Sequence, residues 1–159
     1  MRPDRDEFVS HFGGIYEHSS WVASETFDST NDLSVEELAK LFADCVDAAP
    51  YERRLALICA HPDLAGKAAV AGELTFASTA EQQSAGIDQC TAEEFEQFQA
   101  LNERYKDKFG FPFVMAVRDS NRHEILAAFE ARIGNDPDTE FETAISEIHK
   151  IARLRLEAM

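Results

Sequence analysis

His61 is the residue in this chain whose type and position are best suited to acid–base chemistry. It follows the apolar run of residues 55–58 and precedes Pro62. A residue before proline is pushed out of the helical region, so the sequence predicts a histidine held at the end of a helix. Imidazole is the side chain whose ordinary pKa lies nearest neutrality. Position alone leaves two interpretations open, a helix cap or hydrogen-bonded core residue and a general acid or base.

Glu81 is the second candidate, because a histidine paired with a carboxylate is a common acid–base unit. Small-residue breaks at Gly66, at 71–72 and at 77–78 separate it from His61. Both residues are expected at helix ends, where side chains can converge on a cleft. Glu81 also has a structural interpretation, since Ser78 and Glu81 have the spacing of a capping box at a helix start.

Two arginines, Arg118 and Arg155, are candidates for holding an anion. Arg118 directly follows an apolar run, and Arg155 lies between two leucines in the last predicted helix. A guanidinium beside a core is suited to bidentate capture of a carboxylate or a ureido-like oxygen. The alternative for each is a plain ion pair with one of the 30 acidic residues.

No motif in the sequence indicates a metal or a nucleotide cofactor. It contains no H-E-x-x-H, no EF-hand loop, no cysteine–histidine set, no G-x-G-x-x-G and no G-x-S-x-G. The three cysteines, Cys45, Cys59 and Cys90, lack C-x-x-C spacing, and their apolar or helical neighbours favour buried, inert thiols in a reducing compartment. We therefore expect neither metal nor cofactor.

Composition narrows the class of protein. The chain has 159 residues, 45% of them hydrophobic, which is enough for a packed domain. Its formal net charge of −15 repels phosphate backbones and anionic membranes, so nucleic-acid binding is not expected. Neither a signal peptide nor an apolar run near membrane-spanning length is evident, and we expect no membrane association and a cytoplasmic location.

Hydrophobic periodicity predicts an all-α fold, a single domain over residues 1–159 with about seven to nine helices. Capping boxes at Ser34, Ser78 and Thr91 predict three helix starts, and Gly110 predicts a helix end. A first helix is expected from residue 4 to about 17 with a weak second half, a loop over 19–34, helical turns over 63–70, and a connector at 72–76. Residues 111–117 fit no helix face and are expected to be a buried extended segment or the start of a helix.

Three long blocks give a more specific signal. HPDLAGKAAVAGELTFASTAEQQSAGI, LNERYKDKFGFPFVMAVR and EIHKIARLRL resemble, in the same order, the 2-oxo-4-hydroxy-4-carboxy-5-ureidoimidazoline (OHCU) decarboxylases of uric-acid degradation. The resemblance implies an all-α, cofactor-independent, homodimeric enzyme that acts on a small molecule and makes S-allantoin and CO2. It implies His61 and Glu81 as catalytic residues. The substrate contacts that it implies are Pro62, Ser78, Thr79, Ala80, Glu81, Gln82, Phe113, Val114, Met115, Ala116, Val117 and Arg155.

The resemblance and the residues agree chemically. Loss of CO2 from a carbon beside an imine leaves charge that the conjugated ring absorbs, so the protein must supply orientation, an apolar pocket and a proton on one face. His61 fits the proton transfer, and Glu81 would fix its tautomer or share its proton. Two other functions stay open, an enzyme of the same fold that acts on another purine or ureide and a non-catalytic helical interaction module.

Overall fold

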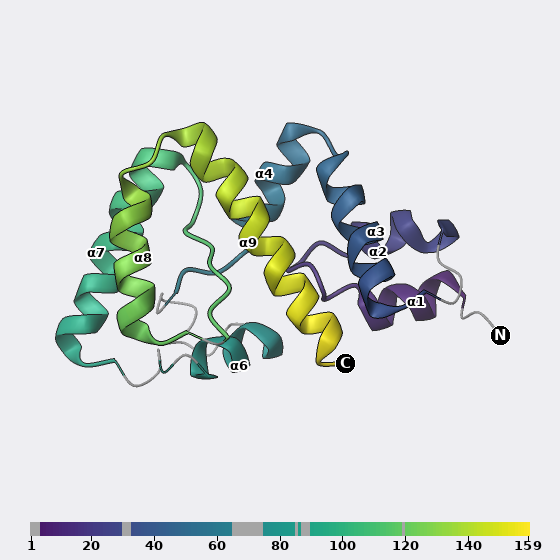
Figure 1. Ribbon diagram of the computed structural model, residues 1–159, viewed down its shortest axis with the longest axis horizontal. Coiled ribbons are helices and arrows are strands. Elements are labelled where there is room, and N and C mark those ends of the chain that lie inside the picture. The colour runs from purple at the N-terminus through teal and green to yellow at the C-terminus, as the bar shows by residue number, and fades with distance from the viewer. Residues whose placement is uncertain (1–3, 30–32, 65–74, 85, 87–89, 119) are drawn as a thin grey trace. The chain divides into compact units, whose positions relative to one another are not determined.

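Helices are the regular structure throughout the described part of the chain. The computed structural model describes residues 4–29, 33–64, 75–84, 86, 90–118 and 120–159. These residues form eight α-helices and one short 3-10 helix, η1, and no strand, which confirms the predicted all-α class (Figure 1). The helical turns expected over 63–70 and most of the connector at 72–76 lie outside the described residues.

The chain divides into two units, Met1–His61 with Ile148–Met159, and Pro62–Glu147. The last helix, α9 (Pro137–Glu157), contributes residues to both. The expectation of a single domain over residues 1–159 stays a prediction, and each unit is described by itself.

The first unit is built around an aromatic core. Its helices are α1 (Arg5–Phe12), α2 (Trp21–Thr26), η1 (Phe27–Ser29), α3 (Val35–Asp47) and α4 (Tyr51–Cys59), with the C-terminal part of α9. The ring of Phe8 lies 5.4 Å from Phe27 and 6.4 Å from Phe42, both edge to face. Ser34 caps α3 by accepting a hydrogen bond from the Glu37 amide, as its spacing predicts.

Two expectations for this unit were wrong. Helix α1 ends at Phe12 rather than near residue 17, because the chain turns at Gly13. The expected loop over 19–34 contains α2 and η1. Burial of Val22, Ala23 and Phe27 against the core outweighs the polar composition of this stretch, and the buried Thr26 hydroxyl donates to the Val22 carbonyl within the helix.

The second unit contains α6 (Phe76–Ser84), α7 (Ala92–Phe109), α8 (Arg122–Ile133) and the start of α9. The Thr91 capping box is present in full, and α7 ends at Gly110 in the left-handed conformation with φ of 79°. Residues 111–117 follow as a segment without regular structure and largely buried, as expected. Phe113 stacks on Phe129 with ring centroids 3.9 Å apart, and the two rings tie this segment to α8.

The start of α6 differs from the prediction. Ser78 lies inside the helix, and its backbone amide donates to the Thr75 hydroxyl 3.2 Å away. The Thr79 amide donates to the Thr75 carbonyl at 2.9 Å, so Thr75 caps the helix three residues before the expected position. Glu81 is therefore not the capping residue that its spacing from Ser78 suggested.

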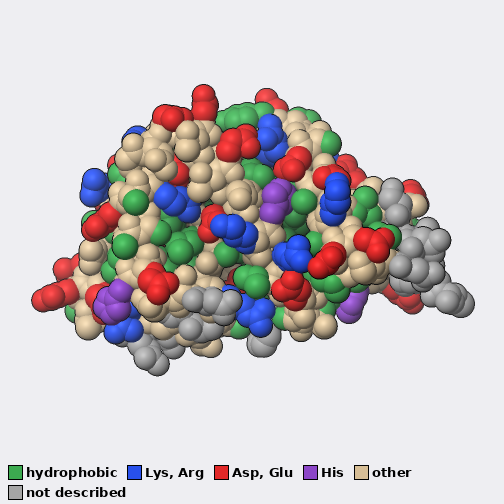
Figure 2. All heavy atoms as spheres, in the orientation of Figure 1, with side chains coloured by type: hydrophobic (Ala, Val, Ile, Leu, Met, Phe, Trp, Pro, Cys, Tyr) green, Lys and Arg blue, Asp and Glu red, His purple; other side chains and the backbone are tan. Residues whose placement is uncertain are grey.

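The surface agrees with the acidic composition. Acidic side chains are spread over the face shown in Figure 2, interspersed with lysines and arginines. Within the described residues, no helix is long and apolar enough to cross a membrane. Cys59 is exposed and Cys45 and Cys90 are half-buried, so the expectation of buried thiols was wrong, most clearly for Cys59.

Candidate active site

His61 lies just beyond the end of α4, where Pro62 stops the helix as predicted. Its backbone amide donates to the Ile58 carbonyl at 3.1 Å, and its ring Nδ1 lies 2.9 Å from the Leu57 carbonyl oxygen. A carbonyl can only accept, so Nδ1 carries the proton in this contact. The other ring nitrogen, Nε2, is then the unprotonated one in the neutral ring. The side chain is held in one orientation and one tautomer by its own helix.

Burial controls the protonation of His61, which is only 8% exposed. Desolvation lowers the pKa of His61 from 6.5 to about 4, against the opposing effects of the Leu57 carbonyl and the Glu17 carboxylate. Arg155 and His18 lower this pKa further. The ring is therefore neutral at pH 7, and Nε2 is available as a base.

The turn between α1 and α2, residues 13–20, carries a buried carboxylate. Glu17 is 2% exposed, and the Ser19 hydroxyl donates to the Glu17 carbonyl at 2.9 Å. His18 follows with φ of 48°, and no other non-glycine residue in the described ranges has a positive φ. A left-handed conformation at such a residue costs roughly 1 kcal/mol or more and is found preferentially at functional sites.

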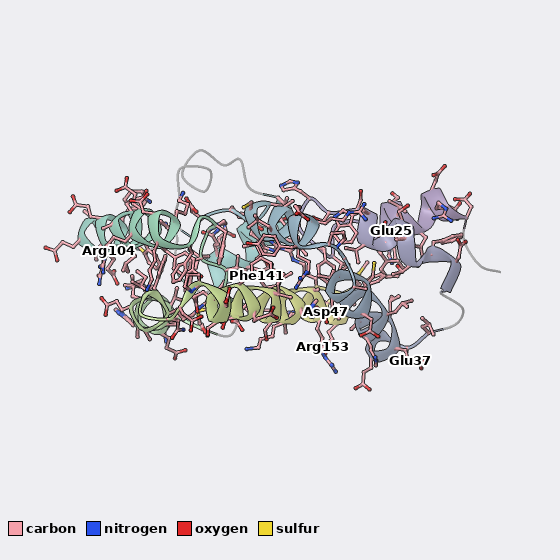
Figure 3. All side chains as sticks on the ribbon, turned by 90° about the horizontal axis from the view of Figure 1, so that it is seen from above. Glu25, Glu37, Asp47, Arg104, Phe141 and Arg153 are labelled. Atoms are coloured by element: carbon pink, nitrogen blue, oxygen red, sulfur yellow. The ribbon has the colours of Figure 1, made fainter. Side chains whose placement is uncertain are left out.

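A chain of hydrogen bonds fixes this turn to α9 and α3. The Tyr16 hydroxyl lies 2.8 Å from Nδ1 of His149, and Nε2 of His149 lies 3.0 Å from a carboxylate oxygen of Asp47, labelled in Figure 3. The carboxylate accepts from Nε2–H, so Nδ1 accepts from the hydroxyl. Burial raises the pKa of Tyr16, which keeps that hydroxyl protonated. The turn is thereby positioned from two helices.

Arg155 reaches the same turn from α9. Its Nη1 donates to the Gly14 carbonyl at 3.1 Å and to the Ile15 carbonyl at 3.5 Å. Its Nη2 lies 3.6 Å from a carboxylate oxygen of Glu17, and the two side chains are 7% and 2% exposed. A buried ion pair that is also hydrogen-bonded to backbone fixes the guanidinium in place.

The burial of Arg155 agrees with its choice as an anion-binding candidate, and Arg118 fits that role less well because it is exposed. Arg153, two positions earlier on α9, lies on the outside of the helix (Figure 3). Its side chain is 51% exposed and pairs with Glu36 and Glu157 on the surface. The contrast follows from the helical repeat, because residues two apart point in different directions.

In the second unit, three side chains bind the residues just after the candidate histidine, two of them through backbone carbonyls. Asn102 Nδ2 donates to the Leu64 carbonyl at 3.0 Å, and Gln82 Nε2 donates to the Asp63 carbonyl at 3.4 Å. Lys106 pairs with the Asp63 carboxylate at 2.6 Å. Helices α6 and α7 together fix this part of the chain.

Helix α6 carries the predicted residues 78–82. Ser78 and Gln82, four positions apart, share the buried face, while Thr79 and Glu81 are half-buried and Ala80 is exposed. Glu81, three positions after Ser78, borders the same face. Gln82 therefore has a structural role at Asp63 in addition to the substrate contact expected from the resemblance.

Two polar groups of segment 113–117 bind protein side chains. The Val114 carbonyl accepts from Arg132 Nη1 at 2.7 Å, and the Ala116 amide donates to a Glu147 carboxylate oxygen at 3.2 Å. The ways in which residues 113–117 could contact a substrate, as the resemblance implies, are therefore narrowed, because the Ala116 amide already donates to Glu147. Phe113, Val114 and Val117 are buried, and Met115 and Ala116 are half-buried.

The structure brings together His61 and Arg155, and it adds Glu17 to them. The predicted site residues from Pro62 to Val117 lie in the second unit, so the pairing of His61 with Glu81 stays a prediction. The Leu57 carbonyl fixes the tautomer of His61, a task that the sequence had suggested for Glu81. The sequence analysis did not single out Glu17. A signal was available, because this acidic residue directly follows the apolar pair Ile15 and Tyr16 in a short stretch that begins with two glycines.

The described residues contain no group of three or more histidine, cysteine or acidic side chains that could hold a metal ion. The expectation of no metal and no cofactor rests on the sequence and stays a prediction. What the first unit does provide is a neutral imidazole with a free basic nitrogen, beside a fixed guanidinium and a buried carboxylate. These features are typical of an enzyme that moves protons on a small polar substrate.

Comparison with known proteins gives the family. The family model for OHCU decarboxylase matches residues 2–157. The OHCU decarboxylase of Haloferax volcanii is 48% identical over 155 residues, which are 98% of this chain and 90% of that protein. The enzyme of the same name from Mus musculus is 35% identical over 153 residues, 96% of this chain and 86% of that protein.

Two solved structures also match this chain. A crystal structure of OHCU decarboxylase in the presence of (S)-allantoin matches with a TM-score of 0.72 and 26% identity, over 95% of this chain and 94% of that one. A crystal structure of (S)-allantoin synthase matches with a TM-score of 0.76 and 34% identity, over 98% of this chain and 50% of that one. The chain belongs to the OHCU decarboxylase family, which confirms the resemblance. It is a carboxy-lyase of uric-acid degradation.

Proposed function

We propose that this protein converts OHCU to S-allantoin and CO2 with His61 as its proton-transfer residue. The observation that supports this most directly is the state of the His61 ring. The Leu57 carbonyl holds the proton on Nδ1 at 2.9 Å, and burial keeps the ring neutral at pH 7. Nε2 is thus a fixed base, at the position that the family resemblance assigns to the acid–base residue.

The reaction then needs few parts. Nε2 of His61 takes the proton of the substrate's 4-hydroxyl group while the bond between C4 and the carboxylate breaks. The electron pair of that bond passes into the adjacent C4–C5 bond and the imine nitrogen, and CO2 leaves. The histidine returns its proton to C5 on one face. The ring nitrogen, which has taken up the negative charge of the lost carboxylate, takes a proton from water and leaves hydroxide. The hydroxyl becomes the ring carbonyl of allantoin, so atoms and charges balance.

Other predicted residues have separate tasks. Arg155 orients the anionic end of the substrate, because a fixed guanidinium presents its donors in a plane that matches a carboxylate. Glu81 accepts or shares a proton, as the family resemblance implies, and the cap of α6 is provided by Thr75. The remaining contacts are proposed from the family resemblance: Pro62, Ser78, Thr79, Ala80, Gln82, Phe113, Val114, Met115, Ala116 and Val117.

No external electron sink is required, because the conjugated imine of the substrate takes up the charge. The rate gain comes from orientation and from an apolar environment that favours loss of a charged group. The substrate also decays without an enzyme to racemic allantoin, so the enzyme supplies speed and handedness. We propose further that the protein acts in the cytoplasm, as the sequence predicts, and as a homodimer, as the resemblance implies.

Circular dichroism of allantoin tests the proposal. Urate is treated with urate oxidase and the hydrolase that follows it, with no further protein, with this protein, or with His61→Asn. Only the unsubstituted protein should produce a rapid optically active signal. His123→Asn is the matched control, since its side chain is 74% exposed, and it should behave as wild type. A signal equal to enzyme-free decay in every tube would leave the activity on another purine or ureide, or the interaction module.

A further inference from the structure

Glu17 is the buried charge in the first unit that the proposed mechanism does not use. Its side chain is 2% exposed and pairs with the guanidinium of Arg155, whose Nη2 lies 3.6 Å away. Removing a carboxylate from water costs free energy that the ion pair only partly offsets. A hydrophobic residue would fill the same space without this cost, so the carboxylate has a use beyond packing.

The charge balance around His61 indicates what that use is. In the first unit three charged or titratable groups act on the ring, Glu17 and His18 from the turn and Arg155 from α9. Glu17 offsets the charge of Arg155, so that the guanidinium beside the neutral ring is compensated. Glu17 also favours the protonated ring, which forms only during proton transfer.

We propose that Glu17 is a positioning residue for the decarboxylation, which holds the Arg155 guanidinium in place and offsets its charge, so that the carboxylate of the substrate is oriented without being bound too tightly to leave. This proposal rests on the proposed function. The substrate carries a full carboxylate charge before reaction, and that charge moves into the ring as CO2 leaves. An uncompensated arginine would stabilise the starting carboxylate more than the transition state and would slow the step.

The test variant is Glu17→Gln, which keeps the size of the side chain and removes its charge. We expect KM to fall about threefold, because Arg155 is freed to bind the carboxylate, and kcat to fall about tenfold. A purely structural role would lower activity without lowering KM. Glu36→Gln is the control, since Glu36 is 82% exposed and pairs with the surface residue Arg153, and both constants should stay at wild-type values.

A second measurement needs no substrate. The ring signals of His61 are followed by NMR as pH is lowered, and in Glu17→Gln their transition should move to lower pH. If Glu17→Gln does not fold, Glu17→Asp, which keeps the charge on a shorter side chain, carries the test. In Glu17→Asp the pH of the His61 transition should stay close to the wild-type value, because the charge is kept. KM should rise, because the shorter side chain reaches Arg155 less well and the guanidinium loses its orientation.

Two outcomes would overturn the proposal. One is a folded Glu17→Gln protein whose His61 transition and KM both equal those of wild type. The other is a Glu17→Asp protein in which the pH of the His61 transition falls as far as expected with no carboxylate at position 17. An inactive wild-type protein is a different result, because it refutes the proposed function while the NMR titration still decides whether Glu17 acts on His61.

Discussion

The buried, neutral state of His61 makes acid stability the sharpest test of the site. The pKa of this ring is about 4 in the folded protein, against an ordinary value of 6.5, because burial disfavours the imidazolium. Between these two pH values the unfolded chain binds a proton that the folded protein does not. The contribution of the neutral His61 ring to the free energy of unfolding is therefore fully present above pH 6.5 and is lost as pH falls toward 4.

The size of the effect follows from the two pKa values. Each pKa unit corresponds to about 1.4 kcal/mol, and between pH 7 and pH 5 the linkage amounts to about 2 kcal/mol for this one group. Other groups also contribute to the pH dependence of stability, so measurements on wild type alone do not isolate the contribution of His61. His61→Asn has no titrating ring, and the difference between the two free energies of unfolding cancels the shared contributions.

The assay is urea unfolding at a series of pH values, followed by the fluorescence of Trp21, the single tryptophan of the chain. The advantage of wild type over His61→Asn should shrink by about 2 kcal/mol from pH 7 to pH 5. His123→Asn, with a side chain that is 74% exposed, should run nearly parallel to wild type. A His61→Asn difference that stays constant within about 0.5 kcal/mol would refute the reasoning.

Three further predictions test how the site is assembled. Arg155→Lys loses the planar guanidinium that binds the turn of residues 13–20 and should lower kcat/KM about tenfold or more in the allantoin assay. Arg153→Lys, on the exposed side of α9, should change kcat/KM less than twofold, and equal effects of the two variants would contradict a role of Arg155 in substrate binding. In a double-mutant cycle, His61→Asn and Glu81→Gln should be strongly non-additive in kcat if both act on one substrate, and additive losses would argue against a shared site. Arg132→Gln should destabilise the protein by roughly 3 to 5 kcal/mol in urea, because it leaves the fully buried carboxylate of Glu140, 2.9 Å from Arg132 Nε, without this counter-charge; a loss under about 1 kcal/mol would contradict the reasoning.

Much of the local structure was predictable because its causes lie within a few residues of one another. The cap of Ser34, the capping box of Thr91 and Glu94 and the helix end at Gly110 all appear where the sequence predicts them. His61 lies beyond a helix end because proline follows it. The order of the three long sequence blocks was sufficient to identify the family, since such blocks are far more specific than short motifs.

Other local predictions failed where packing outweighed composition. The polar stretch around Trp21 forms α2, because several of its residues bury against the aromatic core. Ser78 and Glu81 have the spacing of a capping box, yet Thr75 caps the helix and Ser78 lies inside it. A Ser-x-x-Glu motif shows that a cap is possible, but it does not show whether the hydroxyl of Thr75 or that of Ser78 provides it.

The chain by itself determined its helices, its acidic surface, its family and the candidate histidine. Only the tertiary structure decided the surroundings of that histidine. Arg155 reaches the Gly14 carbonyl across 141 positions of sequence, and Glu17 joins it from the same turn. The pKa of His61 depends on the burial and the charges that these distant segments supply. Neither periodicity nor spacing encodes such contacts, because they exist only when segments far apart in the chain pack together.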